Sequence, residues 1–548
     1  MTSFGLHHIR LVYRVIKMYS TSTSSSYEDA IKKLNSLQSN KATIEQIKKN
    51  LKTGEKCTNI GDMANYLRRI GIPLTKLDEL SVIHVAGTKG KGSTSAMCES
   101  ILRHHGFRTG FYSSPHLVAA RERVRLDGQQ LTKDAFATHL HRVYGLLKDT
   151  QEYDGDMPKY FAFLTVTAFY VFLLEKVDVA IIEVGIGGVV DYTNVLRKVP
   201  VVGITALGLD HTSILGTTLP EIAAAKAGVM KPGCRAYTVQ QPAVAMDVLT
   251  AFADHVKCPL TVVPAYTDYT FPNTEKSQLK VDLDAYRINA SLAIQLSHAW
   301  MRITQTKNDF VSLSNKAQYH STNGYQMDSK NGNTVHNGVT NGNGKCLASK
   351  MQNGFKNGHK DQNGVTNWDI QGDLVYEVPY ETAEGLRQCK WPGRYHIIEA
   401  DHAKFYLDGA HTKESMEICA SWYKDSSSTS DTLVFSATGD RNAEMLLQPL
   451  SGIPFQQVYF VIPTAHNVTT QNHDNYSLVE QEELIQRCRK HAEIWKKINP
   501  DSDVTVLECV SDALINIKKR KGIPSVLITG SLHLVGAALS ILDPNLST

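Results

Sequence analysis

Short apolar runs alternate with amphipathic helical stretches along much of the chain. Apolar segments at Val82–Ala86, Arg108–Tyr112, Val179–Val184 and Val201–Leu207 have the length of buried strands. Apolar strands that alternate with helices are typical of a parallel sheet with helices on both faces. The pattern therefore predicts an α/β fold built on a doubly wound parallel sheet in this part of the chain.

The same rhythm returns after Trp368. The apolar runs of strand length are Lys404–Leu407, Thr432–Phe435, Val458–Ile462, Val504–Leu507 and Val526–Thr529. Helical stretches separate these runs, which again predicts strands alternating with helices. We expect a second, smaller Rossmann-like α/β domain here.

The N-terminal part of the chain has a different composition. Residues 1–26 contain no acidic side chain, alternate basic with aliphatic residues and end in a Ser/Thr run. This composition is typical of a mitochondrial transit peptide, and chance composition in a disordered N-terminus is the alternative. Met18 offers a second start that would drop the basic half, so we expect a mitochondrial form (matrix or inner-membrane associated) and a cytosolic form. From Tyr27 to Leu74, apolar residues at helical spacing predict a short helical arm.

Asn-Gly dipeptides recur between residues 305 and 367, with few aliphatic residues between them. A segment this polar cannot bury enough apolar area to offset its chain entropy. We therefore expect a disordered Asn/Gly-rich insertion at 305–367. It would separate an N-terminal domain at 27–304 from a C-terminal domain at 368–548.

Composition narrows the class of protein. The 548 residues include 58 Lys and Arg against 54 Asp and Glu, a net charge of +4, which argues against a nucleic-acid partner bound by charge. The apolar stretch Phe161–Leu174 falls short of the roughly 20 residues that span a bilayer, so we expect a buried helix and no integral membrane contact. None of the nine cysteines has CxxC spacing, so the sequence supports neither a zinc site nor a disulfide framework.

A glycine-rich loop follows the first predicted strand. Residues Gly87–Ser93 read Gly-Thr-Lys-Gly-Lys-Gly-Ser and precede a helical run at Thr94–His104. Glycines let backbone N–H groups approach phosphate oxygens, and the helix N-terminus favours an anion. Lys91 is expected to contact the outer phosphates, with the Ser93 hydroxyl nearby. The spacing departs from G-x-x-x-x-G-K-[ST] because Gly92 separates lysine from serine, and a flexible basic turn is the alternative.

Polar side chains also follow three other predicted strands. Glu183 ends a buried strand, Asp210-His211 follows the next one, and Ser113-Ser114 follows the strand after the glycine-rich loop. The carboxyl ends of parallel strands meet at one edge of the sheet, where ligands bind. Glu183 is a candidate Mg²⁺ ligand, because Mg²⁺ takes one or two carboxylates beside phosphates and water. A strand-capping glutamate and a structural Asp-His pair are the alternatives.

Three further polar residues are candidates on weaker grounds. Lys226 lies in a helix of small residues, where a solvated lysine is the alternative. In the second domain, Arg394 follows the rigid Trp391-Pro392-Gly393 turn and suits a phosphate. Asp408 begins an Asp-Gly-Ala-His run at a strand end and suits a ribose or an ammonium group. The aromatic pair Tyr160-Phe161 is expected to belong to the core rather than to a pterin site.

Taken together, these motifs resemble folylpolyglutamate synthase, within the Mur ligase superfamily, and the N-terminal arm favours the eukaryotic branch. The resemblance covers most of the chain outside the leader and the Asn-Gly segment. The matching motifs are Tyr27–Asn40, Gly87–Ser93, Ser113–Leu117, Arg121–Arg123, Glu183–Gly188, Asp191–Asn194, Asp210–Thr212, Trp391–Arg394, Asp408–Thr412, Ala437–Arg441 and Thr529–His533.

The resemblance implies an ATP-dependent acid–amino-acid ligase, with an ATP-binding N-terminal domain and a C-terminal glutamate ligase domain. It would add L-glutamate to the γ-carboxyl of tetrahydrofolate and its (poly)glutamates through an acyl phosphate, retaining folates for one-carbon metabolism. The implied cofactors are ATP and Mg²⁺, with a monovalent cation such as K⁺ as a further candidate. We expect a monomer with reduced folate, L-glutamate and ATP as substrates.

The resemblance also implies residue roles. Nucleotide binding falls to Thr88, Lys89, Gly90, Lys91, Gly92, Ser93, Asn289, Arg394, Asp408 and His411. Ser114, Glu183 and His211 would hold Mg²⁺. The catalytic set would be Lys91, Glu183, His211 and Lys226, and Lys226 matches a lysine that is carbamylated in some family members.

One motif departs from the family. Ala285-Tyr286 stands before Asn289 where the family usually has His-Gln, which predicts altered ATP affinity or reduced activity. The alternatives are dihydrofolate synthase, a bifunctional enzyme, and a weakly active paralogue or scaffold. A cell-wall Mur ligase is disfavoured because too few residues precede Gly87, and a guanine-nucleotide switch is disfavoured because no N-K-x-D motif follows the loop.

Overall fold

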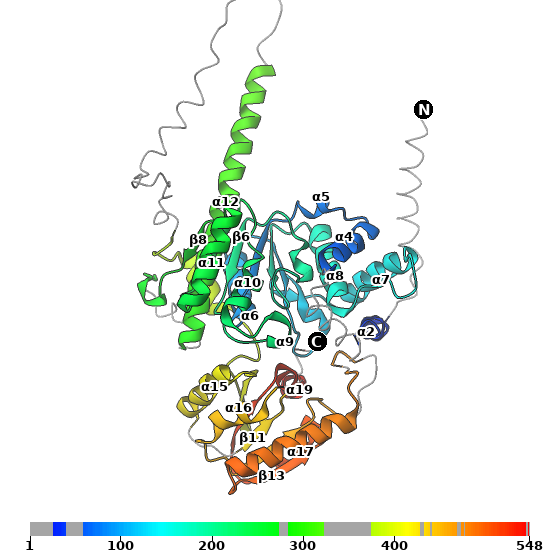
Figure 1. Cartoon of the computed structure of the whole chain (residues 1–548), viewed down its shortest axis with the longest axis vertical. Coiled ribbons are helices and arrows are strands. Elements are labelled where there is room, and N and C mark those ends of the chain that lie inside the picture. Colours follow the sequence, from blue (N-terminus) through cyan, green and yellow to red (C-terminus); the bar gives the residue numbers. More distant parts are fainter. Residues whose placement is uncertain are drawn as a thin grey trace, which may run out of the picture.

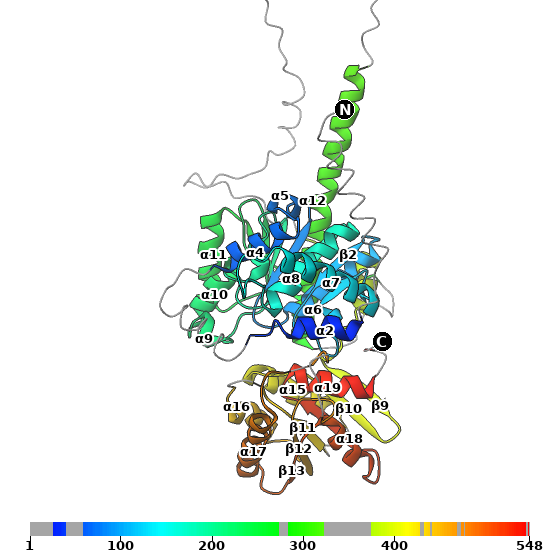
Figure 2. The same cartoon turned by 90° about the vertical axis from the view of Figure 1, so that its right-hand side faces the viewer.

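The computed structural model describes residues 26–39, 58–272, 283–322, 374–427, 432–438, 441–467, 473–475, 477–543 and 546. Within these residues the strands form an eight-stranded sheet and a six-stranded sheet. Each sheet belongs to one domain, and the two domains lie one above the other in Figures 1 and 2. The proposed leader at 1–25 and most of the Asn-Gly segment, at 323–367, lie outside the described residues.

The N-terminal domain is built on the eight-stranded sheet, in the order β4-β3-β2-β5-β1-β6-β7-β8. Strand β1 lies in the middle, between β5 and β6, so the loop that follows β1 begins near the centre of the sheet edge. The pairs β2–β3 and β3–β4 at one edge are antiparallel, and the other strand pairs are parallel. The strands are β1 Val82–Ala86, β2 Thr109–Tyr112, β3 Val124–Leu126, β4 Gln129–Gln130, β5 Val179–Glu183, β6 Val201–Ile204, β7 Arg235–Thr238 and β8 Leu260–Val262.

Helices cover both faces of this sheet. Val82 and Ala86 belong to one apolar cluster and Ile83 and Val85 to another, as the period-two alternation of a strand requires. The first cluster holds the arm helices and α7, α8, α10 and α11, and the second holds α6, α12 and α14. The helices are α2 Tyr27–Asn35, α4 Asn59–Arg69, α5 Leu74–Leu77, α6 Lys91–His104, α7 Lys133–Asp149, α8 Tyr160–Glu175, α9 Thr212–Leu215, α10 Leu219–Ala227, α11 Ala243–Val256, α12 Asp284–Thr322 and α14 Tyr380–Gln388; the 3₁₀ turns are η1 Ala120–Arg123, η2 Tyr192–Val195 and η3 Tyr266–Asp268.

The C-terminal domain repeats the design on a smaller scale. Its sheet has the order β13-β12-β11-β14-β10-β9, and β9 alone among these described strands runs antiparallel to its neighbour. Two apolar clusters lie on its two faces. The elements are β9 His396–Ala400, β10 Ala403–Asp408, α15 Lys413–Ser426, β11 Thr432–Phe435, α16 Ala443–Leu447, η6 Gln448–Leu450, β12 Gln457–Val461, α17 Gln481–Ile498, β13 Asp503–Leu507, α18 Val510–Lys518, β14 Ser525–Thr529 and α19 Leu532–Leu542.

The passage between the domains differs from the predicted boundaries. Helix α12 continues to Thr322, well past the position 305 at which the insertion was expected to begin. Helix α14 follows the predicted boundary at 368 but packs on the N-terminal domain, where Ser100 Oγ donates to Gly385 O at 2.7 Å. Small residues allow this contact, because a Cβ on Gly385 would lie 2.7 Å from Ile101 Cα. The chain therefore crosses to the second sheet only after Trp391.

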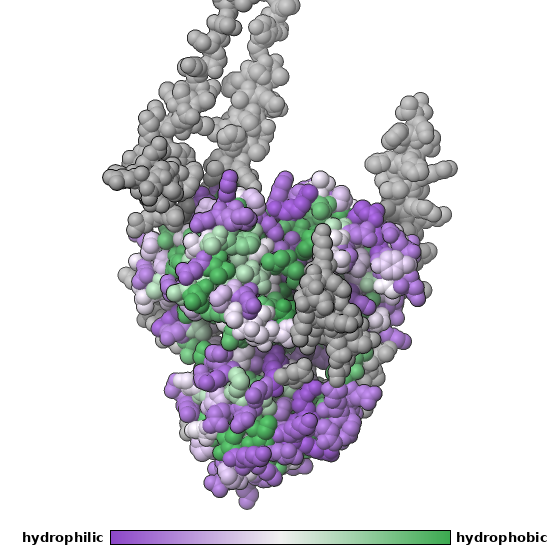
Figure 3. Space-filling view, viewed as in Figure 1, coloured by the Kyte–Doolittle hydropathy of each residue, from purple (hydrophilic) through white to green (hydrophobic). Residues whose placement is uncertain are grey.

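The predicted doubly wound fold is confirmed, and the predicted strands lie within one to three residues of those observed. The apolar stretch at Phe161–Leu174 forms α8, most of whose side chains are buried. Among the described residues we find no helix whose length and apolarity would let it cross a bilayer. The cysteines of the described residues are free thiols. The surface in Figure 3 is largely hydrophilic over the C-terminal domain, whereas hydrophobic side chains gather over part of the N-terminal domain.

Candidate active site

A cavity of about 1560 Å³ lies between the two domains. On the N-terminal side it meets the loops that follow β1, β2, β5 and β6, all at the carboxyl edge of the sheet. On the C-terminal side it meets residues 391–395, the segment after β10 and the start of α19. The predicted residues that line it are Thr88, Lys89, Gly90, Lys91, Gly92, Ser93, Ser114, Glu183, His211, Asn289, Arg394, Asp408 and His411.

The glycine-rich loop is held from two sides. The backbone N–H groups of Thr88 and Lys89 both donate to Ala206 O at 3.0 Å. Gly90 has a φ of 89° and lies against α12, where a Cβ would meet Asn289 Oδ1 at 2.0 Å. Helix α6 begins at Lys91, three residues before the predicted Thr94, and no side chain caps its N-terminus. Its first N–H groups are therefore available to an anion in the cavity.

Gly92, which interrupts the usual phosphate-loop spacing, has a structural reason to be glycine. A Cβ at this position would lie 2.8 Å from Trp391 Cζ2 and 3.4 Å from Glu183 Oε2. Trp391 itself packs edge-on against Phe111, with ring centroids 5.6 Å apart. Trp391, the first residue of the link between the two domains, therefore packs directly against the phosphate loop.

Glu183 is a buried carboxylate at the end of β5, 5% exposed. Its Oε2 accepts the Ser114 N–H at 3.1 Å, which brings two of the three predicted metal ligands together. Burial raises the pKa of Glu183 to about 7, and the nearby charge of Lys91 opposes this rise. Glu183 lines the cavity beside the phosphate loop, and its carboxylate is the kind of oxygen donor that Mg²⁺ prefers.

His211 and Asp210 lie on the loop after β6. Asp210 Oδ2 pairs with Lys89 Nζ at 3.5 Å, and its Oδ1 accepts the His211 N–H at 2.9 Å. Burial raises the pKa of Asp210, but Lys89 and His211 outweigh it and lower that pKa to about 2. Burial lowers the pKa of His211, which keeps its imidazole neutral and able to bind a metal.

No group of three or more His, Cys, Asp or Glu side chains in the described part of the chain could hold a metal ion by itself. A cation bound between Glu183 and His211 would therefore need further oxygen ligands. The phosphates of a nucleotide on the adjacent loop are the usual source of such ligands for Mg²⁺.

Lys226 lies behind the cavity wall and is 3% exposed. Its Nζ donates to Gly87 O at 2.7 Å, so it supports the first glycine of the phosphate loop. Burial lowers the pKa of Lys226 to about 7, and the positive charge of Lys91 adds to the effect. The alternative of a solvated helix lysine is therefore wrong for this residue.

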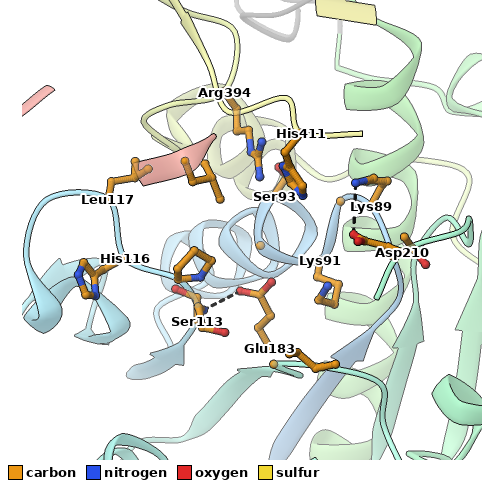
Figure 4. Close-up of a pocket in the computed structure, with 18 of the residues that line it drawn as sticks. Lys89, Lys91, Ser93, Ser113, His116, Leu117, Glu183, Asp210, Arg394 and His411 are labelled. Atoms are coloured by element: carbon orange, nitrogen blue, oxygen red, sulfur yellow. Dashed lines mark hydrogen bonds and ion pairs between the residues drawn. The ribbon is translucent and has the colours of Figure 1, made fainter. Parts of the chain in front are cut away.

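The C-terminal domain contributes Arg394, Asp408 and His411 to the cavity lining, and Figure 4 shows Arg394 and His411 facing the phosphate loop. Asp408 Oδ2 accepts the Tyr395 N–H at 3.1 Å, and burial raises the pKa of Asp408 while Arg394 opposes the rise. His411 Nδ1 lies 2.7 Å from Gly409 O, which makes it the protonated ring nitrogen and leaves Nε2 as the acceptor. Burial lowers the pKa of His411 to about 3.

Comparison with known proteins identifies the family of this chain. A family profile described as "Dihydrofolate synthetase, C-terminal domain" matches residues 394–541. The chain is 33% identical to "Folylpolyglutamate synthase, mitochondrial" of Homo sapiens, covering 96% of this chain and 93% of that one. It is 34% identical to the protein of the same name of Bos taurus, covering 95% and 93%. The chain belongs to the folylpolyglutamate synthase family.

Solved structures of the family share the fold. "Crystal Structures of Mycobacterium tuberculosis Folylpolyglutamate Synthase Complexed with ADP and AMPPCP" describes a chain with a TM-score of 0.61 and 20% identity, covering 88% of this chain and 95% of that chain. "FPGS-AMPPCP-folate complex" has a TM-score of 0.57 and 20% identity, covering 89% and 96%. Both support the two-domain α/β architecture described above.

The departure from the family motif lies at the cavity. Ala285 and Tyr286 both line it at the start of α12, and Tyr286 is only 7% exposed. Tyr286 belongs to the apolar cluster that also holds Leu386 and Cys389 of the α14 segment. The tyrosine ring therefore fills an apolar site next to the interdomain link.

Several cavity residues were not predicted from the sequence. Tyr160 and Phe161, expected in the core, are only partly buried and line the cavity at the start of α8. Arg441 also lines it, held by donating from Nη1 to Thr438 O at 2.8 Å. Both motifs were visible in the sequence, since Arg441 ends a stretch that resembles the family and the aromatic pair follows a turn. Nothing in either pattern showed that the side chains face a ligand site.

Proposed function

We propose that this chain uses ATP to add L-glutamate to the γ-carboxyl of tetrahydrofolate and its (poly)glutamates. One observation carries the proposal: a phosphate loop on one domain and Arg394, Asp408 and His411 on the other face a single interdomain cavity. Relatives that match nearly the full chain bear the name folylpolyglutamate synthase. Product folates would be retained for one-carbon metabolism.

The chemistry follows from the poor electrophilicity of a carboxylate. Transfer of the γ-phosphoryl group of ATP to the folate carboxylate gives an acyl phosphate. The glutamate amine then attacks the carbonyl carbon, the C–O bond to phosphate breaks, and inorganic phosphate leaves as the amide forms. Lys89 and Lys91 would neutralise charge on the phosphoryl oxygens, as cationic side chains do in phosphoryl transfer.

The remaining predicted residues take supporting roles in this proposal. The first N–H groups of α6, with Thr88, Gly90, Gly92 and Ser93, would bind the phosphates. Asn289 would hold the loop from α12, and Arg394, Asp408 and His411 would contact the nucleotide from the C-terminal domain. Ser114, Glu183 and His211 would hold Mg²⁺, which when bound supplies charge neutralisation at the transferring group.

Lys226 is a candidate for carbamylation. A lysine reacts with CO₂ only as the neutral amine, and a pKa of about 7 leaves much of Lys226 neutral at physiological pH. Its carbamate would add an anionic oxygen ligand next to the phosphate loop. Acid-labile CO₂ on the purified protein, absent from Lys226→Met, would support this role. A ¹³C NMR spectrum at neutral pH and saturating ¹³C-bicarbonate that shows no carbamate signal would contradict it.

The folate would lie toward the aromatic end of the cavity. Tyr160, Phe161 and Tyr192 line this end, and the rings of Phe161 and Tyr192 lie with centroids 6.4 Å apart. Aromatic side chains suit stacking against a flat heterocycle. A pterin placed here would leave its glutamate tail directed at the phosphate loop.

The decisive assay incubates the chain with ATP, Mg²⁺, tetrahydrofolate and labelled glutamate. We expect labelled folate products that lengthen with time. Dihydropteroate serves as the parallel substrate, because the matched C-terminal profile is described as dihydrofolate synthetase. Product from dihydropteroate alone would assign dihydrofolate synthase, product from both a bifunctional enzyme, and nucleotide binding without product a scaffold. Replacing K⁺ by choline in the same assay tests the monovalent cation.

We further propose mitochondrial and cytosolic forms and a monomeric state. The relatives from Cricetulus griseus, Bos taurus and Homo sapiens carry "mitochondrial" in their names, and the leader composition supports the same address. Tagged chains that start at Met1 and at Met18 should distribute differently between the compartments. Identical distributions would contradict the use of Met18 as a second start. The molar mass of the purified chain, measured by light scattering, tests the monomeric state.

A further inference from the structure

Residues 473–475 of the C-terminal domain contact the N-terminal domain at a place separate from the covalent link. Asp474 Oδ1 accepts two hydrogen bonds at 2.7 Å, one from the Tyr27 hydroxyl and one from the Ala120 N–H. Tyr27 is the first residue of α2, and Ala120 begins η1. A single carboxylate oxygen therefore joins the N-terminal arm, the loop after β2 and the C-terminal domain.

The neighbours of Asp474 make two more contacts of the same kind. Asn35, on the last turn of α2, donates from Nδ2 to His473 O at 2.9 Å. Asn475 Nδ2 donates to Val118 O at 3.2 Å. We call the contacts of residues 473–475 with Tyr27, Asn35, Val118 and Ala120 the interdomain clasp. Figures 1 and 2 both place α2 at the boundary between the two domains.

The loop that the clasp holds is braced by its own hydrogen bonds and reaches the proposed metal site. It runs from Ser113 to Arg123, and Ser114 at its start contacts Glu183. The Glu122 carboxylate accepts the N–H groups of the three residues at 117–119 at 2.7 to 2.9 Å, which fixes the loop's centre. A displacement at Ala120 is therefore carried toward Ser114.

The same loop packs against the C-terminal domain at two glycines. A Cβ on Gly536 would lie 1.9 Å from Leu117 O, and one on Gly393 would lie 2.9 Å from Leu117 Cδ1. These contacts seat the loop between α19 and the covalent link. The hydrogen bonds of the clasp attach this loop to the C-terminal domain at a further place, separate from these two packing contacts.

We propose that Asp474 closes an interdomain clasp that holds the C-terminal domain over the phosphate loop, as a positioning residue for the ligase reaction. Only the expected effect on kcat rests on the proposed function; the contacts of the clasp do not. The covalent link at 391–394 is one point of attachment and leaves rotation about it open. A second attachment through α2 and the loop after β2 removes that freedom and sets the distance of Arg394 and His411 from Lys91.

The test compares three variants of the full chain. Asp474→Ala removes the shared acceptor, whereas Asp474→Asn keeps an amide oxygen that can accept both hydrogen bonds. Tyr27→Phe removes one donor and leaves the ring in place. Matched controls are Asp501→Ala, on an exposed turn, and Tyr153→Phe, at a side chain that is 68% exposed.

We expect Asp474→Ala to lower kcat about tenfold, the effect of losing one buried hydrogen bond from the closed state. Binding of AMPPCP to the N-terminal phosphate loop should change much less. Small-angle scattering should show a larger radius of gyration for Asp474→Ala, and Asp474→Asn should restore both kcat and the radius. The effects of Tyr27→Phe and Asp474→Ala should be less than additive, because both remove the same contact.

The clasp is overturned if Asp474→Ala keeps the parent kcat and scattering profile. It is also overturned if Asp474→Asn loses as much activity as Asp474→Ala with no change in scattering. Should Asp474→Ala fail to fold, Tyr27→Phe carries the test with smaller shifts of the same sign, and Asp474→Asn should match the parent chain. A parent chain without ligase activity would contradict the proposed function. The scattering comparison would still test whether Asp474 holds the two domains together.

Discussion

Glu183 is a single residue whose burial lowers the stability of the folded protein at neutral pH. Its pKa is raised from 4.5 to about 7 because it is buried, so the folded state binds a proton that the unfolded state has released. Between these values stability falls as pH rises, and above pH 7 the ionised carboxylate costs about 3 kcal/mol. We predict that Glu183→Gln raises the thermal midpoint of the ligand-free protein at pH 8 and does so much less at pH 5.

The control for this prediction is Glu493→Gln, an exposed glutamate of α17. It should leave the midpoint unchanged at both pH values. If Glu183→Gln has the same effect at pH 5 as at pH 8, ionisation of this carboxylate is not the cause. Loss of ligase activity in Glu183→Gln would show that Glu183 is needed for the reaction although it lowers the stability of the protein.

Gly92 yields a second prediction at this scale. Gly92→Ala adds a Cβ that would meet Trp391 Cζ2 at 2.8 Å, so the ring and the interdomain link must shift. We predict a loss of about 5- to 150-fold in kcat/KM for ATP, which corresponds to the 1–3 kcal/mol typical of overpacking. The matched control is Gly61→Ala in α4, where nothing lies within 4 Å and the substitution should leave activity intact. Full activity of Gly92→Ala would show that Trp391 moves without cost.

Tyr286 marks the limit of what the sequence could predict about a single residue. Its departure from the family motif was visible, but its burial against the α14 segment was not, because that contact joins residues about a hundred positions apart. Replacing Ala285-Tyr286 by His-Gln places an amide in this apolar site. We predict that this variant has a lower thermal midpoint. Any gain in ATP affinity is measured separately, by calorimetric titration of AMPPCP. An unchanged midpoint would show that water reaches this site and solvates the amide.

At the scale of elements, a buried ion pair fixes the position of α8. Arg69 Nη1 lies 2.9 Å from Asp156 Oδ2, with side chains 2% and 6% exposed, and Arg69 Nη2 donates to Leu147 O. It thus joins the ends of α4 and α7 to the turn before α8, which carries Tyr160 to the cavity. We predict that Asp156→Ala destabilises the fold by about 3–5 kcal/mol, because it leaves a buried guanidinium unpaired.

Chemical denaturation measures this loss, with Glu152→Ala as the matched control. Arg68 and Glu152 form a neighbouring pair at 3.7 Å whose side chains are 65% and 63% exposed. Breaking such an exposed pair costs about 1 kcal/mol or less. Equal effects of the two substitutions would contradict the role assigned to Asp156.

Elements were predictable where burial gives a strand or helix its own pattern. The central strands β1, β5, β11 and β14 are buried on both faces and read as continuous apolar runs. Strands β3, β4, β7, β8 and β9 were missed, because each is short or mixes apolar with polar residues. Helix α14 was assigned to the wrong side of the boundary, since its contact with α6 depends on Gly385 rather than on periodicity.

At the scale of the whole molecule, the sequence indicated two domains and a shared crevice but not their mutual position. That position depends on contacts between distant residues, such as Trp391 on Gly92 and Leu117 on Gly536. In each contact a neighbouring group approaches a glycine backbone closely, and such a contact leaves no periodic signal in the chain. The candidate site was predictable on the N-terminal side, where motifs follow strands, and less so where the second domain completes it.

The arm helix α2 gives the last prediction, because it links the two proposed starts to catalysis. A chain that begins at Met18 keeps Tyr27, whose hydroxyl binds Asp474, together with Ala30, Ile31 and Leu34, which are fully buried. We predict equal kcat for chains that begin at residues 1 and 18. A chain that begins at residue 37 loses the clasp and exposes the apolar surface beneath α2, so it should lose both kcat and thermal stability. Equal activity of all three chains would show that α2 takes no part in holding the domains together.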